Sequence, residues 1–159
     1  MTETSYDEML KRLKKYQVFG GTLRLPGGSN EGEDRFVRLS YYFELLPEPK
    51  NYREAIAGPM SLIRSAQIPL RNPEKEQAFE KLSEADRIWA GSQTNWISAI
   101  DVTNKVYYIN SAMSPSIFWV KLKDLDLSPQ SSVRYLDPND IHLEGDVAGR
   151  FKEWKPPAN

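Results

Sequence analysis

The chain has 159 residues, a length typical of one domain whose core is large enough to fold without a disulfide or a metal. Its 21 Lys and Arg residues nearly balance its 22 Asp and Glu residues, which argues against nucleic acid and anionic membranes as partners. With no cysteine and a single histidine, His142, these residues offer no disulfide framework, no cysteine nucleophile and no histidine-rich zinc site. We therefore expect neither a metal nor a cofactor.

The first residues are polar and acidic, without the apolar segment of a signal peptide, and nowhere do eighteen apolar residues run together. We expect no membrane association and, by default, a cytoplasmic location.

A first amphipathic helix is predicted over Ser5–Tyr16, where apolar residues recur at steps of three and four. Ser5 or Thr4 can cap its N-terminus, and Gly20-Gly21 should end the segment. The glycines of Thr22–Glu33 then predict a loop before the next helix.

Two further helices are predicted after this loop. One begins at Glu33 and continues until Pro47 stops it. Asn51 is suited to cap the other, and its apolar residues extend from Tyr52 to Ile63. Pro59 should kink or restart that helix.

Residues 66–91 are rich in proline and charge and predict an excursion with a surface helix around Glu76–Leu82. From Asn95 onward β-branched and aromatic residues dominate, which indicates three strands: Trp96–Val102, Val106–Asn110 and Ile117–Leu122. Helices followed by antiparallel strands indicate an α+β fold, which we predict to be one domain over residues 1–159.

Several stretches resemble one family. The most specific is Gly21–Arg38, a Leu-Pro-Gly loop followed by Arg-Phe-Val-Arg. Weaker similarity follows, in the same order along the chain, in Pro49–Gly58, Asn104–Tyr108, Ser114–Trp119, Lys123–Asp126 and Gly145–Gly149. On these motifs the chain resembles the C-terminal half of the choloylglycine hydrolase family, the bile salt hydrolases and penicillin V acylases.

The resemblance implies part of a four-layer αββα N-terminal-nucleophile hydrolase fold. Its members use an N-terminal cysteine to hydrolyse linear amides. It also implies that Arg35, the first arginine of Arg-Phe-Val-Arg, is a catalytic residue that lies near this cysteine and favours its thiolate. Asp34 could pair with Arg35, and Arg38 is the other candidate for the catalytic arginine.

One family feature is missing. Counting back from Tyr6-Asp7 puts Thr2 where the family has an asparagine of the oxyanion hole, and a threonine is too short to replace that amide donor.

Other candidate sites have simpler explanations. The glycine-rich loop before Arg35 lacks Gly-Lys-Ser, so a nucleotide site is not expected. His142 near Asp140 and Glu144 is most simply a surface histidine. The aromatic residues could line an acyl pocket but are more simply core: Tyr41, Tyr42, Phe43, Trp96, Tyr107, Tyr108, Phe118 and Trp119.

The sequence thus predicts a truncated chain or a subunit of a linear amide hydrolase, acting on bile salt conjugates, penicillin V or N-acyl amides only when a complementing part supplies the cysteine. An exposed packing face should then lead to self-association or to binding of that part. The alternative is a non-catalytic binding or interaction domain derived from the same fold.

Overall fold

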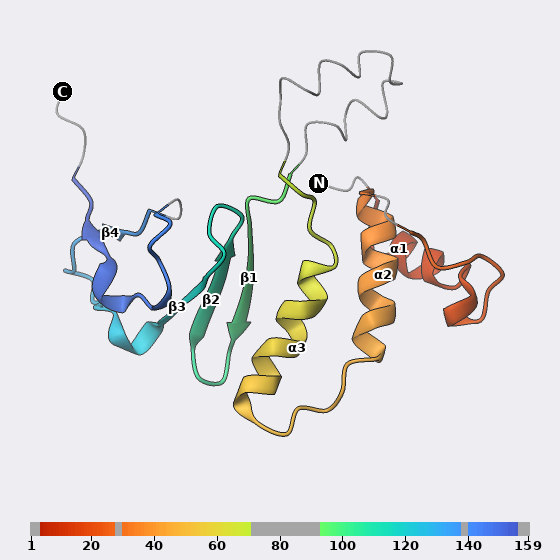
Figure 1. Cartoon of the computed structure of the whole chain (residues 1–159), viewed down its shortest axis with the longest axis horizontal. Coiled ribbons are helices and arrows are strands. Elements are labelled where there is room, and N and C mark those ends of the chain that lie inside the picture. Colours follow the sequence, from red (N-terminus) through yellow and green to blue (C-terminus); the bar gives the residue numbers. More distant parts are fainter. Residues whose placement is uncertain (1–3, 28–29, 71–92, 138–139, 156–159) are drawn as a thin grey trace, which may run out of the picture. The chain divides into compact units, whose positions relative to one another are not determined.

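The structure is a computed structural model that describes residues 4–27, 30–70, 93–137 and 140–155. Contacts divide the chain into two compact units, Met1–Thr94 and Asn95–Asn159. The first unit is helical and the second is built from strands, which confirms the predicted α+β class (Figure 1). That residues 1–159 form one domain stays a prediction.

The first helix, α1 (Tyr6–Leu13), is capped by Ser5, as the sequence predicts. The Ser5 hydroxyl accepts from the backbone N–H of Glu8, and the Glu8 carboxylate accepts from the backbone N–H of Ser5 at 3.0 Å. This reciprocal pair satisfies two of the N–H groups that a helix start leaves open. None of the α1 residues is fully buried, so the cap and the contacts with α2 stabilise α1.

A tight turn follows α1 through the short 3₁₀ helix η1 (Gln17–Phe19). Gly20 ends this helix at φ 88°, a conformation that favours glycine. Gly21 lies against the backbone of Lys15, where an added Cβ would be 2.2 Å from the Lys15 carbonyl carbon. The predicted break at Gly20-Gly21 is confirmed, and each glycine has its own physical reason.

Two longer helices complete the first unit. The second helix, α2 (Gly32–Glu44), buries Val37 completely and ends before Pro47. The third, α3 (Tyr52–Arg64), is capped by Asn51, whose side chain accepts from the backbone N–H of Glu54 at 3.0 Å. It continues through Pro59 as one helix, so the helix does not restart there, and the alternative of a kink at Pro59 stays a prediction. The surface helix expected at Glu76–Leu82 lies outside the described residues.

The second unit contains a four-stranded sheet in the order β1-β2-β3-β5. Its three longer strands are β1 (Trp96–Asp101), β2 (Val106–Ser111) and β3 (Ile117–Lys121), which confirms the three predicted strands. They pair antiparallel, with Ala99 opposite Tyr108 and Tyr108 opposite Trp119. The fourth strand, β5 (Gly145–Asp146), adds to β3 in parallel.

The end of the chain folds over one face of this sheet. It contains the 3₁₀ helices η3 (Leu122–Asp124) and η4 (Ala148–Arg150) and a two-stranded pair, β4 (Arg134–Tyr135) with β6 (Lys152–Glu153). Phe118 and Val120 of β3 pack with Leu143 and Val147 into the buried core of this unit. The exposed fraction of Phe118 is 1%.

None of the helices in the described part of the chain is both long and apolar enough to cross a membrane.

Candidate functional site

Arg35 lies in the first turns of α2, where its backbone N–H donates to the carbonyl of Glu31 at 3.0 Å. Its side chain is half-buried, and its Nε is buried without a hydrogen-bond partner. No hydrogen bond or ion pair joins its guanidinium to another residue in the ranges that the structure describes. A cation at the positive end of a helix gains nothing from the helix dipole, so the position is costly unless an anion approaches it.

Asp34 does not pair with Arg35 as the sequence suggested. It accepts instead from Nη2 of Arg12 at 2.8 Å and from the hydroxyl of Tyr16 at 3.4 Å. The reason is helical geometry, because adjacent residues of a helix point in different directions and Asp34 faces α1.

Glu33 joins the same contact. Its carboxylate accepts from Arg12 and from the hydroxyl of Thr4, so both acids of the first turn of α2 bind residues of the α1 segment. We call this set the Arg12 cluster; its members are Thr4, Arg12, Tyr16, Glu33 and Asp34. The acidic side chains are 25% and 14% exposed for Glu33 and Asp34, so water screens this pair of bridges only in part.

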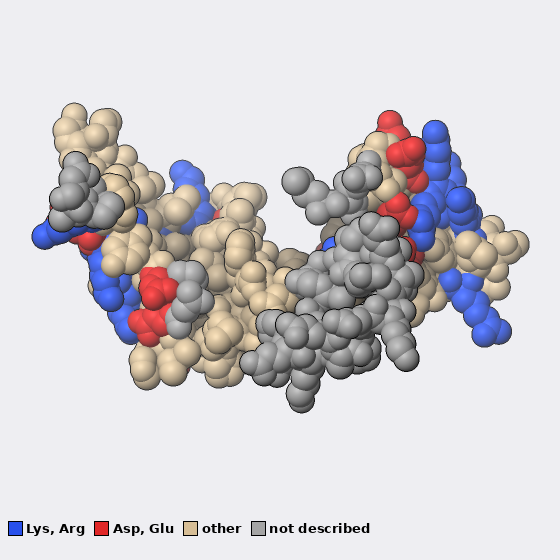
Figure 2. Space-filling model, turned by 90° about the horizontal axis from the view of Figure 1, so that it is seen from above, with Lys and Arg blue, Asp and Glu red and all other residues tan. Residues whose placement is uncertain are grey.

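The cluster perturbs the arginine that it surrounds. Burial opposes the charge of Arg12, but hydrogen bonds with Tyr16 and Asp34 and the attraction of Glu33 outweigh it and raise the pKa of Arg12 above its usual range. Acidic and basic atoms adjoin over α1 and α2 on the right of Figure 2. Arg12 is thus held charged between the two carboxylates.

Arg38, the other candidate, has a structural partner. Its Nη1 donates to the carbonyl oxygen of Gly27 at 2.7 Å and so ties α2 to the preceding loop. Of the two arginines of the motif, Arg35 is therefore the one without a described partner. Thr2, the position of the family's amide donor, lies outside the described residues.

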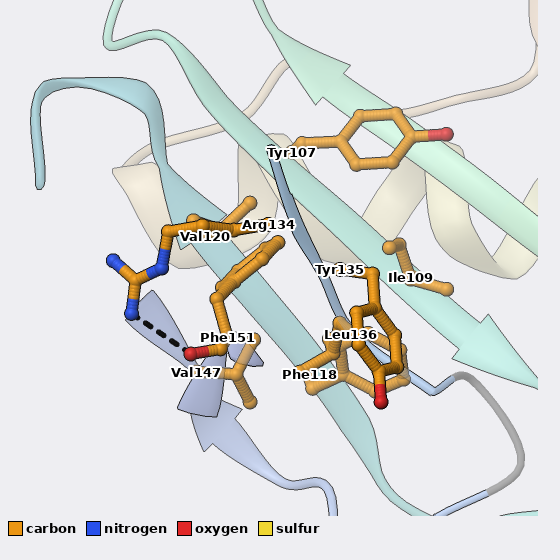
Figure 3. Close-up of a pocket in the computed structure, with 9 residues that line it drawn as sticks. All are labelled: Tyr107, Ile109, Phe118, Val120, Arg134, Tyr135, Leu136, Val147 and Phe151. Atoms are coloured by element: carbon orange, nitrogen blue, oxygen red, sulfur yellow. Dashed lines mark hydrogen bonds between the residues drawn. The ribbon is translucent and has the colours of Figure 1, made fainter. Parts of the chain in front are cut away.

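The second unit contains an apolar cavity of about 330 Å³ between the sheet and the end of the chain. Ile109, Phe118 and Val120 of the strands line it together with Val147 and Phe151 (Figure 3). At its margin Nη2 of Arg134 donates to the carbonyl of Phe151 at 2.8 Å. Most of its lining is apolar, and its titratable residues are Tyr107, Arg134 and Tyr135.

The predicted aromatic set divides between core and surface. Tyr107 and Phe118 line the cavity, and Tyr108 contacts Trp119 at a ring distance of 5.9 Å. Phe43 and Trp96 are exposed, at 64% and 61%. Among the described residues the structure does not gather this set into one pocket.

His142 remains a surface residue. Its side chain is exposed, and its backbone N–H donates to Asp140 at 2.9 Å. No group of three or more potential metal ligands occurs in the residues that the structure describes. The charged run after Glu74 and the glycine-rich loop at residues 28–29 lie outside them.

The Arg12 cluster was not predicted from the sequence. No local signal marks it, because the helix dipole by itself favours acids such as Glu33 and Asp34 in a first turn, and Arg12 is more than twenty positions away in the sequence.

Comparison with known proteins gives a consistent result. Residues 2–141 match the model of a family described as linear amide C-N hydrolases, choloylglycine hydrolase family. A penicillin V acylase of Pectobacterium atrosepticum is 30% identical over 168 residues, an alignment that covers 96% of this chain and 42% of the acylase. A solved penicillin V acylase structure from Agrobacterium tumefaciens superposes with a TM-score of 0.71 at 34% identity, over 98% of this chain and 47% of that one.

The structural match confirms the predicted fold, part of the αββα N-terminal-nucleophile hydrolase arrangement. The chain nevertheless spans less than half the length of either relative.

Proposed function

Because the chain belongs to the choloylglycine hydrolase family of linear amide C–N hydrolases, we propose that it forms part of an amide hydrolase and contributes Arg35 to the catalytic centre. The observation on which this rests is the family match over residues 2–141, which includes the Arg-Phe-Val-Arg motif of Arg35. That both acids before Arg35 are bound to Arg12 supports the assignment, because the guanidinium is then available to an anion.

The nucleophile must come from further polypeptide, either joined to this chain or assembled with it. The 159 residues include no cysteine, and the relatives are more than twice as long as the part that matches. In the proposed reaction a cysteine thiolate attacks the amide carbon and the C–N bond breaks as the leaving amine takes up a proton. Water then hydrolyses the thioester and releases the acid.

Arg35 would act on the first of these steps. A guanidinium within about 4 to 6 Å of a thiol favours the thiolate and lowers the thiol pKa by about one to three units. The substrate class is a linear amide, for which penicillin V, a bile salt conjugate or another N-acyl amide is a suitable probe.

Exposed apolar side chains on the sheet support a complementing partner. Trp96 and Ile100 lie on the same face of β1 because strand residues alternate, and they are 61% and 64% exposed. Val102 directly after the strand is 80% exposed. Large exposed apolar side chains along one strand would suit a surface that another polypeptide covers, either a complementing part or a second copy.

The test is complementation. The chain would be purified alone, and also after co-expression with the coding region next to it or with the remaining part of the Pectobacterium acylase, and release of free amine from penicillin V would be measured. We expect activity only in the complemented samples. Ordinary turnover by the 159 residues alone would refute the missing-nucleophile argument, and no activity with any complement would favour the interaction-domain alternative.

Arg35→Ala then tests the site in the active complex. We expect the rate below the thiol pKa to fall about ten- to a thousandfold, with the pH profile displaced upward, because the thiolate loses its neighbouring cation. Arg53→Ala removes an equal charge from an exposed position of α3 and is the matched control. An Arg35→Ala complex with the full rate would end the site assignment.

A further inference from the structure

We propose that Arg12 is a positioning residue for Arg35. It binds the two carboxylates that precede Arg35 in α2 and so keeps the Arg35 guanidinium free to bind an anion. The inference rests on the proposed role of Arg35, and it concerns a residue on a different helix that the family motif does not include.

The geometry of the Arg12 cluster is the first argument. Arg12 comes from the last turn of α1 and reaches Glu33 and Asp34 together, with Nη2 2.8 Å from the Asp34 carboxylate. Thr4 and Tyr16 donate further hydrogen bonds to the same two carboxylates. The side chains of Arg12, Glu33 and Asp34 are 14% to 31% exposed, so water screens the attraction between their charges only in part.

The second argument is what the acids would do without Arg12. Two half-buried carboxylates would then lie one and two residues before Arg35 without a cation. Asp34 and Arg38 are four positions apart, a spacing at which helix side chains meet, whereas Glu33 and Arg35, two positions apart, do not face each other. The expected effect on Arg35 is therefore one of charge: two uncompensated carboxylates, one and two residues away, would add negative charge near the proposed anion site, and a nearby negative charge raises the pKa of a thiol.

The charges on the other packed helix do not replace Arg12. Three charged side chains of α3 are exposed, namely Arg53, Glu54 and Arg64. Glu54 is already occupied, since it accepts from the Asn51 side chain at 2.8 Å. Among the described residues, the cation that neutralises Glu33 and Asp34 is therefore Arg12.

The first experiment needs no catalytic activity. The Nε–Hε signal of Arg35 in the ¹⁵N-labelled chain would be assigned by its loss in Arg35→Lys. We expect Arg12→Ala to move this signal, and Arg12→Ala with Asp34→Asn to return it toward the wild-type position, while Arg53→Ala leaves it in place. A signal that Arg12→Ala leaves unmoved, or that the second substitution fails to restore, would overturn the proposal.

The second experiment uses the complemented enzyme. Arg12→Ala should displace the pH profile upward by about half a unit or more, which lowers the rate below the thiol pKa about threefold. Asp34→Asn in the same chain should restore the profile, because it removes the uncompensated charge. A purely structural role for Arg12 predicts a lower melting temperature, no displaced profile and no rescue, and that result would refute the proposal.

If the Arg12→Ala variant does not fold, the pH profile of the Asp34→Asn variant tests the proposal by itself. It leaves Arg12 with excess positive charge, so the profile should move downward; an unchanged profile would contradict the inference. The proposed function fails separately, through absence of activity with every complement, and the Arg35 signal then decides the role of Arg12 by itself.

Discussion

Replacing Gly21 by alanine should unfold the turn that joins α1 to the loop before α2. An added Cβ would lie 2.2 Å from the Lys15 carbonyl carbon and 2.3 Å from its oxygen, and neither backbone atom can rotate away as a side chain would. Relief requires the two segments to separate. That movement breaks the hydrogen bonds from Gly21 N to Tyr16 O at 2.8 Å, from Thr22 N to Lys15 O at 2.9 Å and from Leu23 N to Lys15 O at 2.8 Å.

At about 0.5 to 1.5 kcal/mol each, three such bonds correspond to a loss of roughly 1.5 to 4.5 kcal/mol in the free energy of unfolding. Urea unfolding followed by far-ultraviolet circular dichroism measures it. Gly58→Ala is the matched control, because the added methyl would meet only Leu46 Cδ2 at 3.7 Å. Gly58 is inside α3, so this change should stabilise the chain by up to about 1 kcal/mol. A Gly21→Ala chain as stable as the wild type would refute the reasoning.

Three other changes follow from the described contacts. Ser5→Ala removes the cap of α1 and should lower the free energy of unfolding by about 1 kcal/mol, seen as a lower melting temperature. Hydrogen bonds from the Ser5 backbone and hydroxyl lower the pKa of Glu8 below its ordinary 4.5, so its contribution is present above pH 4.5 and is lost as the pH falls through the lower folded value. Glu8→Gln should flatten that acid limb in a pH series of melting temperatures, and an unchanged limb would count against the capping box. Phe118→Ala should cost about 3 to 5 kcal/mol in urea unfolding, whereas Leu127→Ala, at a residue 68% exposed, should change little; equal losses would contradict the assigned core.

The helices and long strands could be predicted because their signals are local. Ser5 and Asn51 mark helix starts by bonds to residues three positions away, and the β-branched and aromatic residues of Trp96–Asp101 are a property of that segment alone. The strands β4, β5 and β6 could not be predicted. Each has only two residues and forms by pairing with a segment far along the chain. Gly145 of β5, for example, pairs with Phe118 of β3.

The candidate site divides in the same way. Arg35 could be selected from sequence because its motif resembles a family pattern. Arg12 could not, since its role depends on a contact with Glu33, which is 21 positions further along the sequence. The cavity in the second unit could not be predicted either, because its lining combines residues of the strands with residues from the end of the chain. Sequence reasoning therefore found the proposed catalytic residue but not the contacts that orient its surroundings.

The parallel pairing of β3 with β5 also sets an order of folding. The strands β1, β2 and β3 are joined by short turns. The pairing of Phe118 with Gly145 instead closes a much longer loop. Closing the longer loop has the greater entropic cost, so the three-stranded meander should form first and the final segment should dock last. On the ribosome this segment also emerges after the three strands. Until it arrives, the face of Phe118 and Val120 is bare, and the nascent chain is most vulnerable to aggregation during that interval.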